Sequence, residues 1–462
     1  MRALVVVTAL ALASCSFTTA SGFVECNTDA DCGAGFACVK TYCLPLPDGC
    51  SRHAGVFNQA NRIPLLAVQP MSSPQGDGGI VTDESEVQAL RAMSLAVEEV
   101  NEREGLKGRK YGLFFCDSND DKNRGAEQAG WLVKNVGVPA ILSSGTGLTN
   151  TIATQADRVA AQAMIISPTA TGTSLVSLFQ SDKNVWRVAP DDSQQAKVLA
   201  NEVAQATAGN VNLKVVIAHV HSDYGNDFQV ALRGELTMRG RQVEAVQFSG
   251  GLNPTDALAV VNTIAAKSPV ATVLIGFAPD VVSIITLASS NPTLRRSAGH
   301  LWFFSDSAKD PAILTPVTGP ELEGRLGTAP AQGAGAAFGS FSDSFLVRYG
   351  IRPDSYSFTS HAFDAAWLTL VATAWAAQNN GGVTGARMRE GMAQLSGTGT
   401  PTQLLDTNWS ALSNAMLEGR AVNVEGSSGP LDFNLDTGTP SAPYEVWQVL
   451  DGGLSTVRLV TP

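Results

Sequence analysis

From Ile63 onward the chain alternates short apolar segments with amphipathic segments, and this alternation most constrains its fold. In a first series, strands are predicted at 63–68, 111–116, 140–142 and 163–166, and helices at 84–103, 123–135 and 150–160. In a second series, after Pro190, strands are predicted at 213–219, 242–248, 272–275 and 301–304, and helices at 227–239, 255–266 and 280–288. Strands alternating with helices at this spacing form parallel sheets with right-handed crossovers. Two such series predict an α/β protein with two doubly wound, Rossmann-like lobes.

Two of the predicted strands end in polar loops. Residues 114–116 lead into Asp117-Ser118-Asn119-Asp120-Asp121, and Ile166 leads into Ser167-Pro168-Thr169-Ala170-Thr171. In an open parallel sheet, ligands bind at the carboxyl ends of the strands. We therefore expect these loops to line a ligand site.

Composition excludes several classes of function. The 462 residues are 44% hydrophobic and 16% charged, which indicates a folded chain of two or three domains. A formal charge of -11 argues against a nucleic-acid partner. No nucleophile elbow, P-loop or dinucleotide-binding turn stands at a strand–helix junction, so neither an enzyme nor a cofactor is expected. His219 and His221 lack an evident third ligand, so no metal is expected either.

The first fifteen residues resemble a lipoprotein export signal. Arg2 gives a positive start, residues 3–13 are apolar, and Leu12-Ala13-Ser14-Cys15 resembles a bacterial lipobox. The segment is too short to span a bilayer. We expect 1–15 to be a signal peptide, with lipid on Cys15 anchoring the exported protein to a membrane. An ordinary signal peptide with a chance cysteine is the alternative.

Four motifs, in this order, resemble the type I periplasmic binding proteins, the branched-chain amino-acid-binding family of solute receptors. They are Pro70-Met71-Ser72, the segments 114–121 and 166–171, and Asp223-Tyr224-Gly225. The segment 426–438 is similar to the family's closing pattern, with Asn434 where the family has Asp. The resemblance covers the chain from about Arg62 to the C-terminus.

The resemblance implies two lobes joined by a three-strand hinge, with crossings near 190, 307 and 410. Lobe 1 is then expected to comprise 61–190 plus 308–410, and lobe 2 to comprise 191–307 plus 411–462. Residues 16–60 are expected to form a tether with a cysteine-rich module.

Cysteine use agrees with export. With Cys15 assigned to lipid, the disulfide candidates are Cys26, Cys32, Cys38, Cys43, Cys50 and Cys116. The first four crowd a segment too poor in apolar residues to bury a core, so disulfides are expected to hold it together. We favour two bridges inside this module and one between Cys50 and Cys116, because Cys116 lacks the partner that several relatives carry in the loop after Ser143. Zinc held by the four close thiolates is the alternative.

On lobe 1, the resemblance implies a carboxylate-binding loop at 143–150 and a second anchoring loop after Pro168. Thr149 is the best candidate hydroxyl of the first loop, with Leu148 as the alternative in register and helix capping as the alternative role. Ala170 and Thr171 fall in the second loop and would offer a backbone group and a hydroxyl. A plain strand-to-helix turn is the other interpretation.

On lobe 2, the resemblance implies two aromatic contacts and one charge. Tyr224 matches an aromatic that closes over the ligand, and Phe277 takes a position where leucine-type receptors have tyrosine. Asp306 follows the strand 301–304, where amino-acid binders carry a carboxylate for the ligand ammonium. A tyrosine that covers the core and a solvated loop aspartate are the alternatives.

Together these features predict an extracytoplasmic, lipid-anchored and monomeric receptor. Its ligand would be a small polar molecule, an amino acid or a related amide or carboxylate, and an ABC-type permease is a possible partner for uptake or sensing. The competing hypothesis is a structural or interaction lipoprotein that has kept the fold and lost the pocket.

Overall fold

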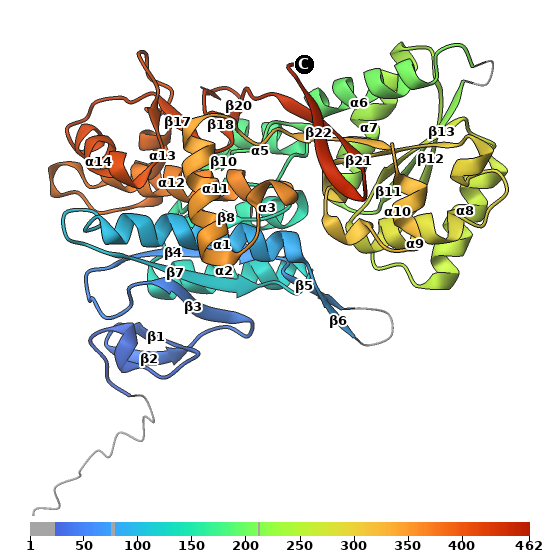
Figure 1. The fold of residues 1–462 in the computed structure, drawn as a ribbon. Helices are drawn as coiled ribbons and strands as arrows, with labels where there is room; N and C mark the ends of the chain where they lie inside the picture. The colour runs from blue at the N-terminus through green and yellow to red at the C-terminus, as the bar shows by residue number, and fades with distance from the viewer. Residues whose placement is uncertain (1–23, 75–78, 211–212) are drawn as a thin grey trace, which may run out of the picture.

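The computed structural model describes residues 24–74, 79–210 and 213–462, and it contains two large sheets that each build one lobe (Figure 1). The predicted two-lobe α/β fold is therefore confirmed. The expected signal peptide, Cys15 and part of the loop after Pro74 lie outside the described residues. Within the described ranges, no helix has the length and apolar character needed to cross a membrane.

Lobe 1 is built on a six-stranded sheet in the order β10-β9-β8-β4-β7-β3. Its strands are β3 (Cys50–Gly55), β4 (Ile63–Gln69), β7 (Tyr111–Asp117), β8 (Ala140–Ser143), β9 (Met164–Ser167) and β10 (Val185–Arg187). All neighbours pair in parallel except β3, which runs antiparallel to β7.

The helices of the first series are α1 (Glu84–Glu102), α2 (Lys122–Val136), α3 (Thr146–Ala153), α4 (Ala156–Ala161) and α5 (Ser174–Ser181). The single helix predicted at 150–160 is thus two helices. Gln155 separates them because its side chain caps α4, accepting from the Arg158 amide at 2.8 Å.

Four later helices also belong to lobe 1: α11 (Ala336–Tyr349), α12 (Thr359–Ala376), α13 (Gly385–Met392) and α14 (Trp409–Leu417). The central one, α12, is buried over nearly its whole length and packs against α1. A helix that is apolar on all sides has to be enclosed in this way.

Lobe 2 is built on a seven-stranded sheet in the order β12-β11-β13-β14-β15-β21-β22. Its strands are β11 (Lys214–Val220), β12 (Gln242–Phe248), β13 (Ala271–Ile275), β14 (Leu301–Phe304), β15 (Leu326–Pro330), β21 (Tyr444–Leu450) and β22 (Gly453–Val460). The first five are parallel, and the last two are antiparallel additions. The helices are α6 (Asp192–Ala206), α7 (Asp223–Met238), α8 (Pro254–Ala266), α9 (Ala278–Ala288) and α10 (Thr318–Leu322).

Two of the expected crossings lie elsewhere along the chain. The strand β15 belongs to the lobe 2 sheet, so the chain enters lobe 1 after Pro330 rather than near 307. The helix α14 packs in the lobe 1 core, where the Trp409 indole donates to the Gly105 carbonyl at 2.8 Å, so the return crossing follows that helix and does not occur at 410. Figure 1 shows α13 and α14 on the side of β4 and α1, and β21 beside the lobe 2 sheet.

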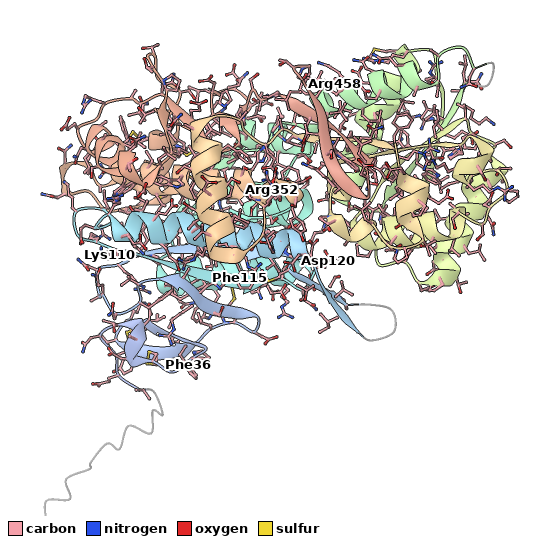
Figure 2. The ribbon with its side chains drawn as sticks, in the orientation of Figure 1. Phe36, Lys110, Phe115, Asp120, Arg352 and Arg458 are labelled. Carbon is pink, nitrogen blue, oxygen red and sulfur yellow. A yellow bond between two sulfur atoms is a disulfide. The ribbon has the colours of Figure 1, made fainter. Side chains whose placement is uncertain are left out.

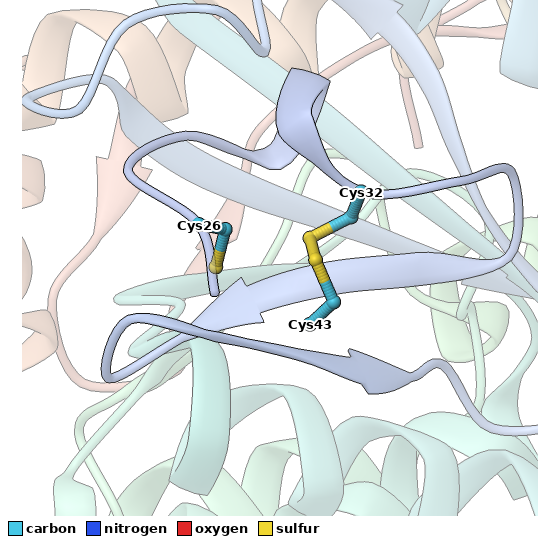
Figure 3. Close-up of side chains that lie close together, drawn as sticks. All are labelled: Cys26, Cys32 and Cys43. Atoms are coloured by element: carbon cyan, nitrogen blue, oxygen red, sulfur yellow. A yellow bond between two sulfur atoms is a disulfide. The ribbon is translucent and has the colours of Figure 1, made fainter. Parts of the chain in front are cut away.

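The cysteine-rich module is a small hairpin of β1 (Phe36–Val39) and β2 (Tyr42–Pro45), held by two disulfides. These join Cys26 to Cys38 and Cys32 to Cys43, and the second is visible as a continuous bond in Figure 3. Because their sulfurs are used in disulfides, these cysteines are not the thiolates that zinc would need.

The third disulfide joins Cys50 to Cys116 and confirms the favoured pairing. These two residues face each other in the register of β3 and β7. Residues 50–55 are therefore an edge strand of lobe 1 and not part of a tether, as had been expected. A buried ion pair between Asp29 and Arg62 also fixes the module to this lobe.

Candidate functional site

The carboxyl ends of the strands in the two sheets meet at one boundary, called here the interlobe boundary. Several contacts connect the lobes there, among them the following three. The Ser174 amide donates to Asp227 Oδ2 at 3.0 Å, and the Ser357 hydroxyl donates to the Asp306 carbonyl at 2.9 Å. Lys122 Nζ lies 3.4 Å from Asp223 Oδ1. Residues far apart in the sequence thus form one surface.

Thr149 lies on α3, and its hydroxyl bonds within lobe 1. It is fully buried and lies 2.8 Å from Ser143 Oγ and 3.4 Å from Ser167 Oγ. It does not cap its helix, because Gly145 occupies the N-cap position and no side chain caps α3. The first amides of this helix therefore have neither an intrahelical nor a side-chain acceptor.

The hydroxyl that reaches toward the second loop is on Thr146. Its Oγ1 accepts from the Gly172 amide at 3.1 Å. In the same loop, Ser144 Oγ donates to Glu86 at 2.5 Å and lies 2.8 Å from Thr169 Oγ1. Sequence reasoning missed these residues, although the run of serine and threonine at 143–149 pointed to the loop.

Ala170 and Thr171 are both buried in the second loop. The Ala170 amide donates to Ser167 Oγ at 3.1 Å. The Thr171 carbonyl accepts from the Asp192 amide at 2.9 Å and from Arg187 Nη1 at 3.1 Å. The Thr171 hydroxyl contacts the carboxyl of Asp192, and this contact lowers the pKa of that acid. The second loop of lobe 1 and the start of α6 therefore meet at these two side chains.

On lobe 2, Asp306 and Tyr224 form one hydrogen-bonded unit. Tyr224 lies in the first turn of α7, and its hydroxyl donates to Asp306 Oδ1 at 2.7 Å. Gln195 Nε2 donates to the same oxygen at 3.0 Å. Asp306 is only 3% exposed, and burial raises the pKa of its carboxyl to about 6.

Phe277 lies beside this unit. It is the N-cap residue of α9 and is 43% exposed, and its ring centroid is 6.3 Å from that of Tyr224. An exposed aromatic ring next to buried polar groups suits contact with the apolar part of a small molecule.

Asp192 is a further residue that sequence reasoning missed. It begins α6 one turn before Gln195, its side chain is fully buried, and its carboxyl interacts with the Thr171 hydroxyl and with the charge of Arg187. Burial raises the pKa of Asp192, and the negative charge of Asp306 raises it further. The acidic start of a helix after Pro190 was the available signal.

Four of the predicted residues are therefore connected. Asp306 bonds to Tyr224, Tyr224 lies beside Phe277, and Asp192 links Asp306 to Thr171. Ala170 is adjacent in the chain, while Thr149 supports the loop from behind. The resulting site has two buried acids and one buried cation, Arg187, so its remaining negative charge favours a donor-rich, positively charged group.

This fold and this interlobe site define a two-lobe solute-binding protein. The family model described as "Periplasmic binding protein" matches residues 66–453, and the chain belongs to that family. The family consists of binding receptors and not of enzymes, and it is periplasmic or extracellular.

Two relatives in sequence bear on the function. The chain is 24% identical over 400 residues to the chemotactic signal transduction system substrate-binding protein BasB of Halobacterium salinarum, covering 85% of this chain and 88% of that protein. It is 28% identical over 156 residues to the Leu/Ile/Val-binding protein homolog 3 of Brucella melitensis, covering 33% of this chain and 40% of that protein.

Solved structures share the fold. The branched-chain amino acid transporter substrate-binding protein LivJ of Streptococcus pneumoniae, in complex with isoleucine, superposes with a TM-score of 0.67 at 18% identity, covering 87% of this chain and all of that one. A solute-binding protein of an ABC transporter from R. palustris, in complex with benzoate, has a TM-score of 0.64 at 15% identity, covering 87% and 97%.

Proposed function

We propose that this protein is an extracytoplasmic receptor that captures a small molecule with an ammonium group, an amino acid or a related compound, at the interlobe boundary. The observation that carries the proposal is the burial of two acids, Asp192 and Asp306, at the boundary, the first beside Thr171 and the second held by Tyr224 and Gln195. Burial and the charge of Asp306 raise the pKa of Asp192 even though the buried cation Arg187 acts on it, so ionising both acids calls for a further positive charge. A ligand ammonium supplies that cation together with three N–H donors.

The other groups have complementary roles. The uncapped N-terminus of α3 and the Thr146 hydroxyl would bind the ligand carboxylate, because helix-start amides favour an anion. Thr149 would hold this loop in place through Ser143, and the Ala170 backbone would line the site. Tyr224 would bridge acid and ligand, and Phe277 would cover the ligand side chain.

Binding on both lobes gives a reason for closure. A ligand shifts a conformational equilibrium only if it binds one state better than the other. A ligand held by α3 on one side and by Asp306 on the other makes both sets of contacts only when the lobes are together. Ligand binding would then close the two lobes about the hinge that the crossing strands form.

The proposed receptor would act in uptake or in sensing while it is anchored to a membrane. Lipid on Cys15 would hold a monomeric receptor near a permease or a signalling partner. The names of the two kinds of relatives, a transporter substrate-binding protein and a chemotactic one, support each of these routes.

The test is a thermal-shift panel on the purified protein with amino acids, amides and benzoates, preceded by native mass spectrometry for a retained solute. A bound ligand raises Tm by mass action. We expect at least one amino acid or amine to raise Tm in a saturable manner. If no solute of any class raises Tm, the protein has lost its pocket and the structural hypothesis replaces this one.

A further inference from the structure

We infer that the two lobes hold each other directly through the first turns of α7, so that the protein closes for part of the time before any solute binds. The contact is called here the interlobe clasp. It consists of Asp223 and Asp227 on lobe 2 with Lys122 and Ser174 on lobe 1. The inference goes beyond the proposed function, because the clasp acts on the lobes whatever solute they bind.

The helix α7 presents both aspartates of the clasp on one side. Asp223 and Asp227 are four residues apart, and residues at this spacing are neighbours on a helix surface. Neither is needed as the cap of its own helix, because the Ser222 hydroxyl caps α7 by accepting from the Gly225 amide at 3.0 Å. Both carboxylates are therefore available to bond outside α7.

The contact of Asp227 is a helix cap supplied across the boundary. The helix α5 begins at Ser174, and the side chain of its N-cap residue, Thr173, makes no capping bond. The first amides of a helix have no acceptor inside the helix. Here the Ser174 amide donates to Asp227 Oδ2 at 3.0 Å, and that carboxylate belongs to the other lobe. Because α5 loses this cap when the lobes separate, the bond favours the closed arrangement.

Glycines in lobe 1 allow the close approach of the two carboxylates. A Cβ at Gly172 would lie 2.8 Å from Asp227 Oδ2, which is closer than side-chain packing permits. A Cβ at Gly147, in the first turn of α3, would lie 3.4 Å from Asp223 Oδ2, and α3 also packs against α7. The backbone of lobe 1 thus reaches both carboxylates with no side chain between them, as glycine permits.

The contact of Asp223 adds a charge pair. Lys122 begins α2, and its Nζ lies 3.4 Å from Asp223 Oδ1. Figure 2 shows Asp120, two residues before Lys122, on the side of lobe 1 that faces lobe 2. Both side chains of the pair are partly exposed, and such a pair contributes little by itself. It matters because it lies one turn of α7 from the Asp227 contact, so one movement of the lobes makes or breaks both.

The clasp raises affinity without touching the ligand. When a solute binds only the closed form, its apparent Kd is the intrinsic Kd divided by the closed fraction of the free protein. A capping bond changes such an equilibrium by about fivefold, and an exposed ion pair by about twofold. Asp227→Ala should therefore weaken every ligand by about fivefold and leave the order of preference among ligands unchanged.

The test measures closure in the ligand-free, full-length protein by hydrogen exchange and small-angle X-ray scattering. In Asp227→Ala we expect the amides at the start of α5 to exchange about fivefold faster, and the radius of gyration to rise. Asp223→Asn touches no residue of α5, yet it should speed the same amides by about twofold, because it weakens closure. Asp343→Asn, at an exposed position on α11, is the matched control and should change neither quantity.

The outcomes separate this inference from the proposed function. Unchanged exchange at α5 in Asp227→Ala, or an unchanged radius of gyration with folding confirmed by circular dichroism, overturns the clasp and leaves the receptor function intact. Faster exchange in Asp227→Ala with none in Asp223→Asn reduces the contact to a local helix cap and also overturns the inference. Loss of compactness in both variants, in a protein that binds no solute of any class, supports the clasp and refutes the proposed function.

Discussion

Replacing Asp306 with asparagine should make the protein more stable and its binding weaker, and these opposite signs make the substitution informative. The buried carboxyl has a pKa of about 6 where the ordinary value is 3.8. At 1.36 kcal/mol per pKa unit, the ionised form at pH 7.5 costs up to about 3 kcal/mol of unfolding free energy. Asparagine removes this charge. Its carbonyl oxygen can still accept from Tyr224 and Gln195, which both donate to Oδ1 in the native protein.

Binding should change in the other direction. An ammonium loses its charged partner and meets an amide N–H in its place, which costs about 2–4 kcal/mol, or about 30- to 1000-fold in Kd. The assay is chemical denaturation of Asp306→Asn and wild type without ligand, followed by titration with the amino acid that gives the largest thermal shift. Asp343→Asn serves as the control for general effects of removing an acid.

The pH dependence provides an internal check on the stability half of this prediction. An acid whose pKa is raised in the folded state binds its proton more tightly there, so its penalty is present above about pH 6 and disappears as the pH falls toward 3.8. The stability gain of Asp306→Asn should therefore shrink to near zero at about pH 4. A variant that is less stable than wild type at pH 7.5, or that binds as tightly, would contradict the reasoning.

Three further perturbations test other parts of the molecule. Replacing both Cys50 and Cys116 with alanine should lower the unfolding free energy by about 4 kcal/mol, because the bridge closes a long loop; unchanged denaturation midpoints would mean that the β3–β7 pairing alone holds the edge. Asp364→Ala should cost about 2–4 kcal/mol in a denaturant titration, since it leaves two backbone amides at 427 and 428 without their acceptor; a loss below about 1 kcal/mol would show that water replaces it. Affinity for an ammonium ligand should fall as the pH drops from 7.5 to 5, because Asp306 becomes protonated near pH 6; a flat profile by calorimetry would remove this carboxylate from recognition.

Periodicity predicted the elements because it is a local property. The stripe of Val87, Leu90 and Val97 placed α1 to within a residue, and the apolar runs placed β4, β7 and the strands of lobe 2. Periodicity did not predict segments that are short or that lack a regular pattern of apolar residues. The strand β15 contains a glycine and a proline and has no alternation, and the apolar face of α14 does not tell which lobe it covers. Because of these two errors, the crossings predicted near 307 and 410 were placed too early in the chain.

The candidate site was predictable where strand ends and family motifs coincide. Tyr224 and Asp306 share a hydrogen bond, and Ala170 and Thr171 are buried in the second loop, while the roles of all four as ligand contacts stay predictions. Asp192 was not predictable as a site residue, because an aspartate at a helix start has an ordinary capping role in most proteins. Its importance comes from burial and from its position near Thr171 and Asp306, which are properties of the packed molecule.

The sequence by itself determined the two-lobe architecture, the strand ends that face a ligand and the abundance of acid in the chain, since hydrophobic period and residue type are written locally. Only the tertiary structure decided that Tyr224 and Gln195 hold Asp306, that Asp192 is buried beside Thr171, and that Thr149 bonds inward. Electrostatic energy depends on distance through space and on exclusion of water, and neither can be read from positions along the chain.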